Sequence, residues 1–167
     1  MDVKSMLTSQ YLASLEMLAR AVDACPEILW TDPKPKNAFW HVAYHVLFYT
    51  HLYLQESESM FTPWVKHRKE SNFLGPLPWP PHREPEKGPA YPKEAVLEYL
   101  DFCRREVRSR MPLVNLESPS GFEWLPFDKL ELQVYNIRHL QHHTAQLLDR
   151  LRNEAGTGVG WVGMMRS

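Results

Sequence analysis

Cysteine is scarce in this chain of 167 residues, and its scarcity argues against two kinds of protein. The two cysteines, Cys25 and Cys103, lie far apart and form no Cys-x-x-Cys pair. A secreted disulfide framework contains more cysteines, and a zinc site built on thiolates needs closer spacing. Both cysteines lie in apolar stretches, where buried free thiols are typical of a reducing compartment. We therefore expect a cytoplasmic protein.

Long apolar runs and clustered charge are also missing. No stretch approaches the roughly 18 uninterrupted apolar residues of a membrane span, and the first residues lack a charged segment followed by a hydrophobic block. The formal net charge is -1, and the basic run at residues 66–69 is short and is followed by Glu70. Because nucleic-acid binders usually present a basic face, we expect neither a nucleic acid nor a membrane as a partner.

The chain does contain a clear helical pattern. Apolar residues recur at three- and four-residue steps in four segments that proline-rich stretches separate. The pattern predicts helices over residues 3–24, 37–55, 93–111 and 128–153. Asn37 and Asp128 are candidate caps at the starts of the second and fourth helices, and Gly156 is a candidate end of the fourth. We predict an all-α fold, with residues 1–167 in a single domain.

The second predicted helix is apolar on almost every side, which is typical of a buried helix. Roughly thirty residues, 59–91, follow it and are rich in proline. A loop of that length can cross a bundle whose helices are about 30 Å long. We therefore predict an up-down-down-up four-helix bundle with a long crossover between helices two and three. Apolar residues in the loop, Trp64, Leu77 and Trp79 among them, indicate that it lies against the bundle.

Histidine is the residue type that points to chemistry, because six of the eight histidines lie on the second and fourth predicted helices. His139 and His143 are four residues apart, so they project from one face of a helix and can chelate one ion. A third ligand has to come from another helix, where His41 and His45 are both candidates. We expect three other histidines at the surface or in loops: His51, His67 and His82.

The pair on the fourth helix belongs to a stripe, with Tyr135 and Gln146, that we expect to face the interior. Burying unpaired imidazoles costs free energy, and a metal ion relieves that cost. The sequence lacks the His-Glu-x-x-His of zinc proteases, the Glu-x-x-His of di-iron bundles, the Cys-x-x-Cys-His of haem attachment and a glycine-rich phosphate loop. The residues therefore favour a site for one metal ion, built on histidine.

Two segments resemble the DinB-like superfamily, which includes the DNA-damage-inducible DinB proteins and the YfiT-like proteins. Residues 137–147 contain the pattern His-x-x-His-His-x-x-Gln, which resembles the signature of the last helix in that family. Residues 40–48, in which a histidine precedes a short apolar run, resemble its second-helix motif. The long crossover is also similar to the layout of the family.

The resemblance implies an up-down-down-up bundle that binds nickel or zinc through one histidine of the second helix and two of the fourth. Carried over to this chain, the ligands are His45, His139 and His143. Four further residues are expected around these ligands, none of them assigned a catalytic role: His41, Tyr135, His142 and Gln146.

The resemblance also implies a function. Family members with an assigned activity include thiol transferases that use bacillithiol or mycothiol, and a maleylpyruvate isomerase. We therefore expect a metal-dependent enzyme, a thiol S-transferase or a hydrolase, with a small-molecule substrate and a low-molecular-weight thiol as co-substrate. The alternative is a non-catalytic metal-binding or stress-response bundle that acts as a dimeric interaction module. A homodimer is compatible with both functions.

Overall fold

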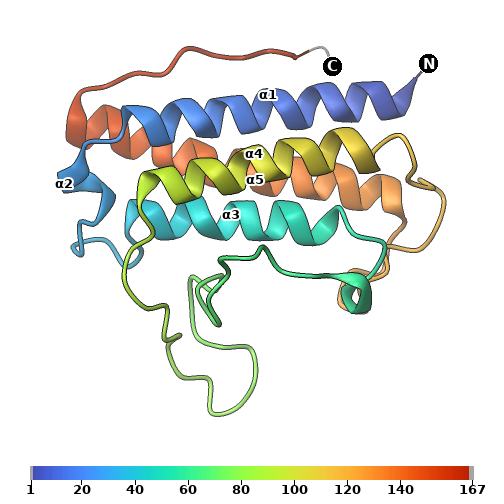
Figure 1. Ribbon diagram of the computed structural model, residues 1–167, viewed down its shortest axis with the longest axis horizontal. Coiled ribbons are helices and arrows are strands. Elements are labelled where there is room, and N and C mark those ends of the chain that lie inside the picture. The colour runs from blue at the N-terminus through green and yellow to red at the C-terminus, as the bar shows by residue number, and fades with distance from the viewer. Residues whose placement is uncertain (1, 166–167) are drawn as a thin grey trace.

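Helices make up the regular structure of the computed structural model, which describes residues 2–165 (Figure 1). The α-helices are α1 (Val3–Ala24), α2 (Glu27–Trp30), α3 (Phe39–Tyr53), α4 (Lys93–Arg110) and α5 (Lys129–Ala155), and a 3-10 turn, η1 (Glu58–Met60), follows α3. The β pairing within the described residues is an isolated bridge between Pro119 and Asp128. The prediction of an all-α fold is confirmed. Within the same residues, no helix combines the length and the apolar composition that crossing a membrane requires.

The ends of α1 and α5 follow from local capping. Asp2 accepts a hydrogen bond of 3.1 Å from the backbone N–H of Ser5, and Asp128 accepts one of 2.8 Å from the backbone N–H of Glu131. The last helix, α5, ends at Gly156, whose φ of 62° lies in the left-handed region that favours glycine. The predicted cap at Asp128 and the predicted end at Gly156 are therefore confirmed.

Asn37 does not cap the second long helix, contrary to the prediction. This helix, α3, starts after Ala38, whose side chain has no acceptor for the free amides of the first turn. The amide of Asn37 instead donates a hydrogen bond of 3.0 Å to the carbonyl of Leu74 in the crossover. The side chain thus attaches the crossover to the start of the helix.

The four long helices lie side by side and run in two directions. Near the start of α3, the guanidinium of Arg150 donates to the carbonyl of Asn37 at 3.2 Å, and near its end the amide of Gln133 donates to the carbonyl of Tyr53 at 3.4 Å. Because Arg150 lies late in α5 and Gln133 lies early, α3 and α5 are antiparallel. In Figure 1, α1 and α5 run from right to left, whereas α3 and α4 run from left to right.

The core is centred on α3, which packs against both α4 and α5. Thirteen of its 15 residues are buried, as the apolar pattern on all its sides predicts. Burial of each large apolar side chain is worth about 1.5–3 kcal/mol, so this helix contributes a large share of the driving force for folding. The apolar surface of α3 is used inside the chain. A homodimer, which stays a prediction, therefore needs a different face.

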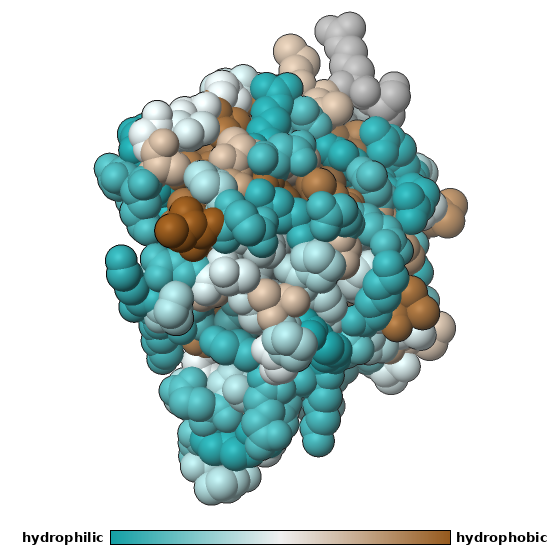
Figure 2. All heavy atoms as spheres, turned by 60° about the vertical axis from the view of Figure 1, so that its left-hand side comes forward, coloured by the Kyte–Doolittle hydropathy of each residue, from teal (hydrophilic) through white to brown (hydrophobic). Residues whose placement is uncertain are grey.

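The crossover between α3 and α4, residues 54–92, is anchored to the bundle by a few side chains. Trp64 and Leu77 are buried, as predicted, and the ring of Trp64 stacks on Tyr99 of α4 with centroids 4.5 Å apart. Trp79 is 47% exposed, so it does not anchor the loop as expected. The tip of the crossover projects from the lower side of the molecule in Figure 1, and Figure 2 shows that projection as largely hydrophilic.

A buried lysine joins three segments at the start of α5. Lys129 is only 3% exposed, and its ammonium donates to the carbonyls of Gln55 and Glu56, both at 2.8 Å, and to the carbonyl of Ser120. These acceptors lie just after α3 and in the loop before α5. An ammonium has three donors, so this geometry satisfies all of them and holds the end of α3 against the start of α5.

Lys129→Met should remove these three charge-assisted hydrogen bonds while keeping a long unbranched side chain. We expect the free energy of unfolding to fall by roughly 3 kcal/mol, because three carbonyls lose their donor. Urea unfolding followed by circular dichroism measures the change. The control is Lys4→Met at the surface, where the ammonium donates to the single carbonyl of Pro112. Equal losses in the two variants would contradict the role of Lys129.

Candidate metal centre

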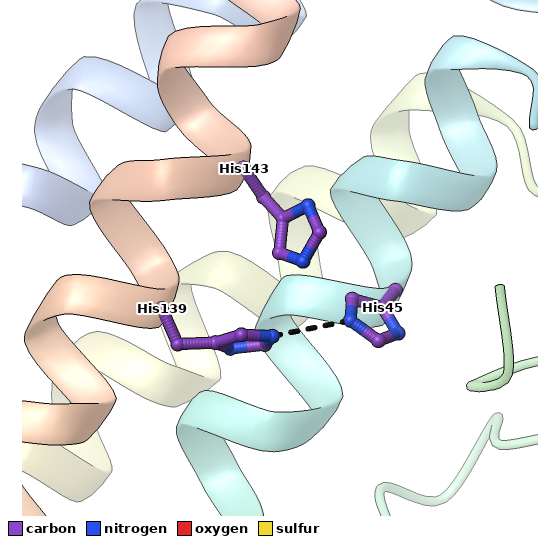
Figure 3. A group of neighbouring side chains, drawn as sticks. All are labelled: His45, His139 and His143. Atoms are coloured by element: carbon purple, nitrogen blue, oxygen red, sulfur yellow. Dashed lines mark hydrogen bonds between the residues drawn. The ribbon is translucent and has the colours of Figure 1, made fainter.

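Three histidines from two helices meet between α3 and α5: His45 on α3, and His139 and His143 on α5 (Figure 3). His139 and His143 lie one helical turn apart, so both project from one face of α5. The antiparallel packing of the two helices sets His45 opposite that pair. Each side chain offers one nitrogen, and the three nitrogens lie within 4.8 Å of one another.

The spacing of the nitrogens matches the size of a divalent ion. Nε2 of His45 and Nε2 of His139 are 3.2 Å apart. Two imidazole nitrogens bound to one tetrahedral zinc ion, at Zn–N distances of about 2.0–2.1 Å, lie about 3.3 Å apart. The ring of His143 stands nearly perpendicular to that of His45, at 81° and 4.8 Å between centroids. The three imidazoles are therefore close enough together to hold one ion.

Hydrogen bonds determine which nitrogen carries the proton on two of the rings. Nδ1 of His45 donates to the carbonyl of Asn72 at 2.6 Å, since a carbonyl oxygen can only accept. Nδ1 of His143 donates to Oε1 of Gln146 at 2.8 Å. With the proton on Nδ1, each Nε2 keeps a lone pair for a metal ion. A second hydrogen bond of this kind is what usually orients a metal-ligating histidine.

The loop that carries Asn72 is itself held by a buried carboxylate. Glu70 is 6% exposed and accepts two hydrogen bonds, of 2.9 and 2.7 Å, from the guanidinium of Arg83. It accepts a third, of 2.9 Å, from the backbone N–H of Glu86. Paired guanidinium–carboxylate bonds give a defined geometry, so the position of the Asn72 carbonyl beside His45 is defined by the crossover.

His139 is oriented by packing. Its Nδ1 is buried and has no hydrogen-bond partner within residues 2–165. Its ring meets the ring of Tyr49 edge-on, with centroids 5.6 Å apart, and also contacts the other two histidines of the group. Of the three imidazoles, His139 is therefore the one whose orientation depends on neighbouring rings.

Burial keeps the three imidazoles neutral. It lowers the pKa of His45 to about 3, although the hydrogen bond to Asn72 acts in the opposite sense. Burial lowers the pKa of His139 to about 4, with His143 and His142 contributing in the same direction, and it also lowers the pKa of His143. Neutral imidazole is the form that binds a metal ion, so the group can accept an ion at neutral pH without first losing protons.

His41 lies one turn before His45 but is not part of this group. It is fully buried, and its Nδ1 is 3.3 Å from the ammonium of Lys87 in the crossover. Burial and the positive charge of Lys87 lower the pKa of His41 to about 4. Of the two candidates that the spacing left open, the structure places His45 beside His139 and His143.

The stripe of α5 that was expected to face the interior lies at the edge of the core. Tyr135, His139 and His143 are half-buried, and Gln146 is exposed. The buried positions of α5 along this stretch are held by Leu132, Gln133, Asn136, Leu140, Thr144, Leu147 and Leu151. The leucines among these residues make the contact between α5 and its neighbouring helices. The stripe therefore lies beside that contact, where the imidazoles are accessible to small molecules.

His142 and Gln146 extend the group toward solvent. His142 is exposed, and its Nε2 lies 3.2 Å from Nε2 of Gln146, the residue that also accepts from His143. A shallow groove runs along this flank of α5 and is lined by Tyr135, Arg138, His139, Gln141, His142 and Ala145. The groove reaches the imidazole group at His139.

His51 was expected at the surface, and this expectation is wrong. The residue is 3% exposed. Its Nδ1 is hydrogen-bonded to the hydroxyl of Tyr99 at 3.2 Å, and its Nε2 lies 3.9 Å from the carboxylate of Glu106. Both partners belong to α4. The expectation fails because α4 supplies polar partners for this side chain inside the bundle.

These buried histidines predict that the metal-free protein loses stability in acid. The imidazoles of His45, His139 and His41 take up protons near pH 6.5 in the unfolded chain but only near pH 3 to 4 in the folded one. The unfolded state therefore binds more protons between these values, and the free energy of unfolding falls as the pH decreases from about 6.5 to about 4. Urea unfolding across this range, with a chelator present, should show the fall, and a flat profile would contradict it.

His51→Gln should make this pH dependence less steep. The substitution removes another buried imidazole, whose pKa burial lowers to about 4 although Glu106 acts in the opposite sense. The slope should decrease by at most about 1.4 kcal/mol per pH unit. The control is His142→Gln, because that side chain is exposed. A slope that changes equally in both variants would show that burial of His51 is not the cause.

Of three comparisons with known proteins, one gave a match, and the matched region includes the three histidines. A search of curated proteins and a search of solved structures each gave no match. The sequence model of the DinB superfamily matches residues 10–147. The matched region begins within α1 and ends within α5, so it includes the whole of α3 and the part of α5 that carries His139 and His143. This chain therefore belongs to the DinB superfamily.

Proposed function

We propose that this chain is a metal-dependent enzyme that holds one divalent ion, nickel or zinc, through His45, His139 and His143 and transfers a small thiol. The supporting observation is the convergence of three neutral imidazoles, two of them with Nδ1 donating a hydrogen bond and a lone pair left on Nε2. The up-down-down-up topology is part of the proposal. In that topology α3 and α5 are antiparallel, and one ligand on α3 lies opposite the other two on α5.

The number of ligands and the groove favour an enzyme over a non-catalytic bundle. Catalytic zinc sites typically have three protein ligands and an open position, whereas structural sites have four protein ligands. The group in residues 2–165 contains three imidazoles. A groove beside His139 gives a substrate access to it, which a purely structural ion would not need.

A divalent ion held by His45, His139 and His143 would lower the pKa of a thiol or of a water molecule bound to it. The protein contributes the rest of the chemistry. Asn72 and Gln146 hold two imidazoles with their protons on Nδ1. His142, exposed at the groove, is the imidazole that accepts the proton a thiol releases, once its Nε2 gives up the hydrogen bond that it accepts from the amide of Gln146.

The reaction class is transfer of the thiol sulfur to an electrophilic carbon of a small-molecule substrate. A new S–C bond forms, the bond between that carbon and its leaving group breaks, and the leaving group departs with the electron pair. The proton of the thiol passes to His142 and from there to the leaving group or to water. Hydrolysis is the same displacement with water in place of the thiol.

Metal analysis tests the site before any substrate is identified. The native protein should carry about one equivalent of nickel or zinc, and His139→Ala should carry less than about a tenth of that, because two imidazoles remain where three are needed. His142→Ala is the control and should retain the metal. A native protein without stoichiometric metal, whose melting temperature did not respond to added nickel or zinc, would rule the proposal out.

Gln146→Leu should weaken metal binding without unfolding the protein. His143 then loses the acceptor that keeps its proton on Nδ1. Loss of such a partner typically costs about 10- to 100-fold in metal affinity. Competition with a chromophoric chelator measures the affinity, and the control is Gln141→Leu, another glutamine of α5 that forms no hydrogen bond to the three histidines in the described residues. If both variants bound metal as the native protein does, the role of Gln146 would be wrong.

A further inference from the structure

The groove beside the histidine group is lined mostly by side chains that can donate a hydrogen bond. Four of its lining side chains carry a group that can donate a hydrogen bond: the phenol of Tyr135, the guanidinium of Arg138, the amide of Gln141 and the imidazole of His142. No lining residue is acidic. A ligand that enters this groove is therefore best matched by an acceptor-rich or negatively charged group.

Arg138 supplies the charge of the groove. Its side chain is exposed, and within the described residues it forms no salt bridge, whereas Arg104, Arg110 and Arg150 pair with acidic neighbours. A guanidinium presents its donors in a planar fork that matches the two oxygens of a carboxylate. Arg138 is thus available to a carboxylate that arrives with a ligand.

The position of Arg138 sets the size of that ligand. Arg138 and His142 lie one helical turn apart, with Cβ atoms about 5–6 Å from each other. His139, a member of the imidazole group, lines the same groove and directly follows Arg138 in the sequence. A ligand whose carboxylate meets Arg138 in this groove therefore has its other end within reach of His139, the member of the imidazole group that lines the same groove.

We propose that the thiol co-substrate is a mercapto acid whose carboxylate binds Arg138 while its sulfur lies at the three-histidine group. This inference rests on the proposed function, because it takes a thiol to be the ligand of that group. Arg138 is then a specificity-determining residue: it selects an anionic thiol over a neutral or cationic one. The step is binding: no bond to carbon forms or breaks in it, and the proton that the thiol releases passes to His142 as in the proposed function.

The test compares two thiols of the same size on the zinc-loaded protein. Isothermal titration calorimetry measures the affinities of 3-mercaptopropanoate and of its neutral amide, 3-mercaptopropanamide. The native protein should bind the acid roughly 10-fold more tightly or better, as expected for charge-assisted hydrogen bonds. In Arg138→Met the two affinities should become equal, with the zinc content unchanged.

The matched control is Arg152→Met, which removes another exposed arginine of α5 about four turns further along the helix. This variant should keep the preference for the acid. Equal affinities for the acid and the amide in the native protein would overturn the mercapto-acid proposal and leave thiol chemistry standing. A preference that survives in Arg138→Met would also overturn it. Binding of neither thiol to zinc-loaded native protein would overturn the proposed thiol transfer together with this inference.

Discussion

The contact between α3 and α5 is the constraint on which the rest of the structure depends. It half-buries imidazoles from both helices at the edge of the core, where a polar group without a hydrogen-bond partner costs free energy. Asn72 and Gln146 offset this cost because they accept hydrogen bonds from Nδ1 of His45 and Nδ1 of His143. The same burial keeps the rings neutral. The three-imidazole group therefore follows from how the apolar helix α3 packs against α5, with the crossover adding one carbonyl.

Much of the fold could be predicted from the sequence because long helices leave a strong periodic signal. The helix at residues 3–24 was predicted with the bounds that α1 has, and the caps at Asp128 and Gly156 follow from local chemistry that needs no tertiary information. The pair His139 and His143 could be predicted for the same reason, since four-residue spacing on a helix is a local property. That His45 rather than His41 joins them depends on how α3 turns against α5, which spacing alone leaves open.

The contacts that the sequence did not reveal are those made by backbone atoms or across distant segments. The carbonyl of Asn72 orients His45, yet every residue has a carbonyl, so no pattern marks this one. Lys129 follows a cap and looks like a surface lysine, but three carbonyls surround its ammonium. His51 is polar on a buried helix, and only the approach of α4 supplies its partners. Each of these cases depends on tertiary packing that overrides the local preference of the residue.

The hydrogen bond from His45 to Asn72 has a thermodynamic consequence for the crossover. It joins a residue of the histidine group to a loop that Glu70 and Arg83 hold in place. Coupling between two sites is reciprocal. If a displacement of residues 70–72 lowers the affinity of the group for an ion, then a bound ion makes that displacement less favourable by the same free energy. One coupling free energy thus links the conformational equilibrium of the crossover to the binding of an ion by the histidine group.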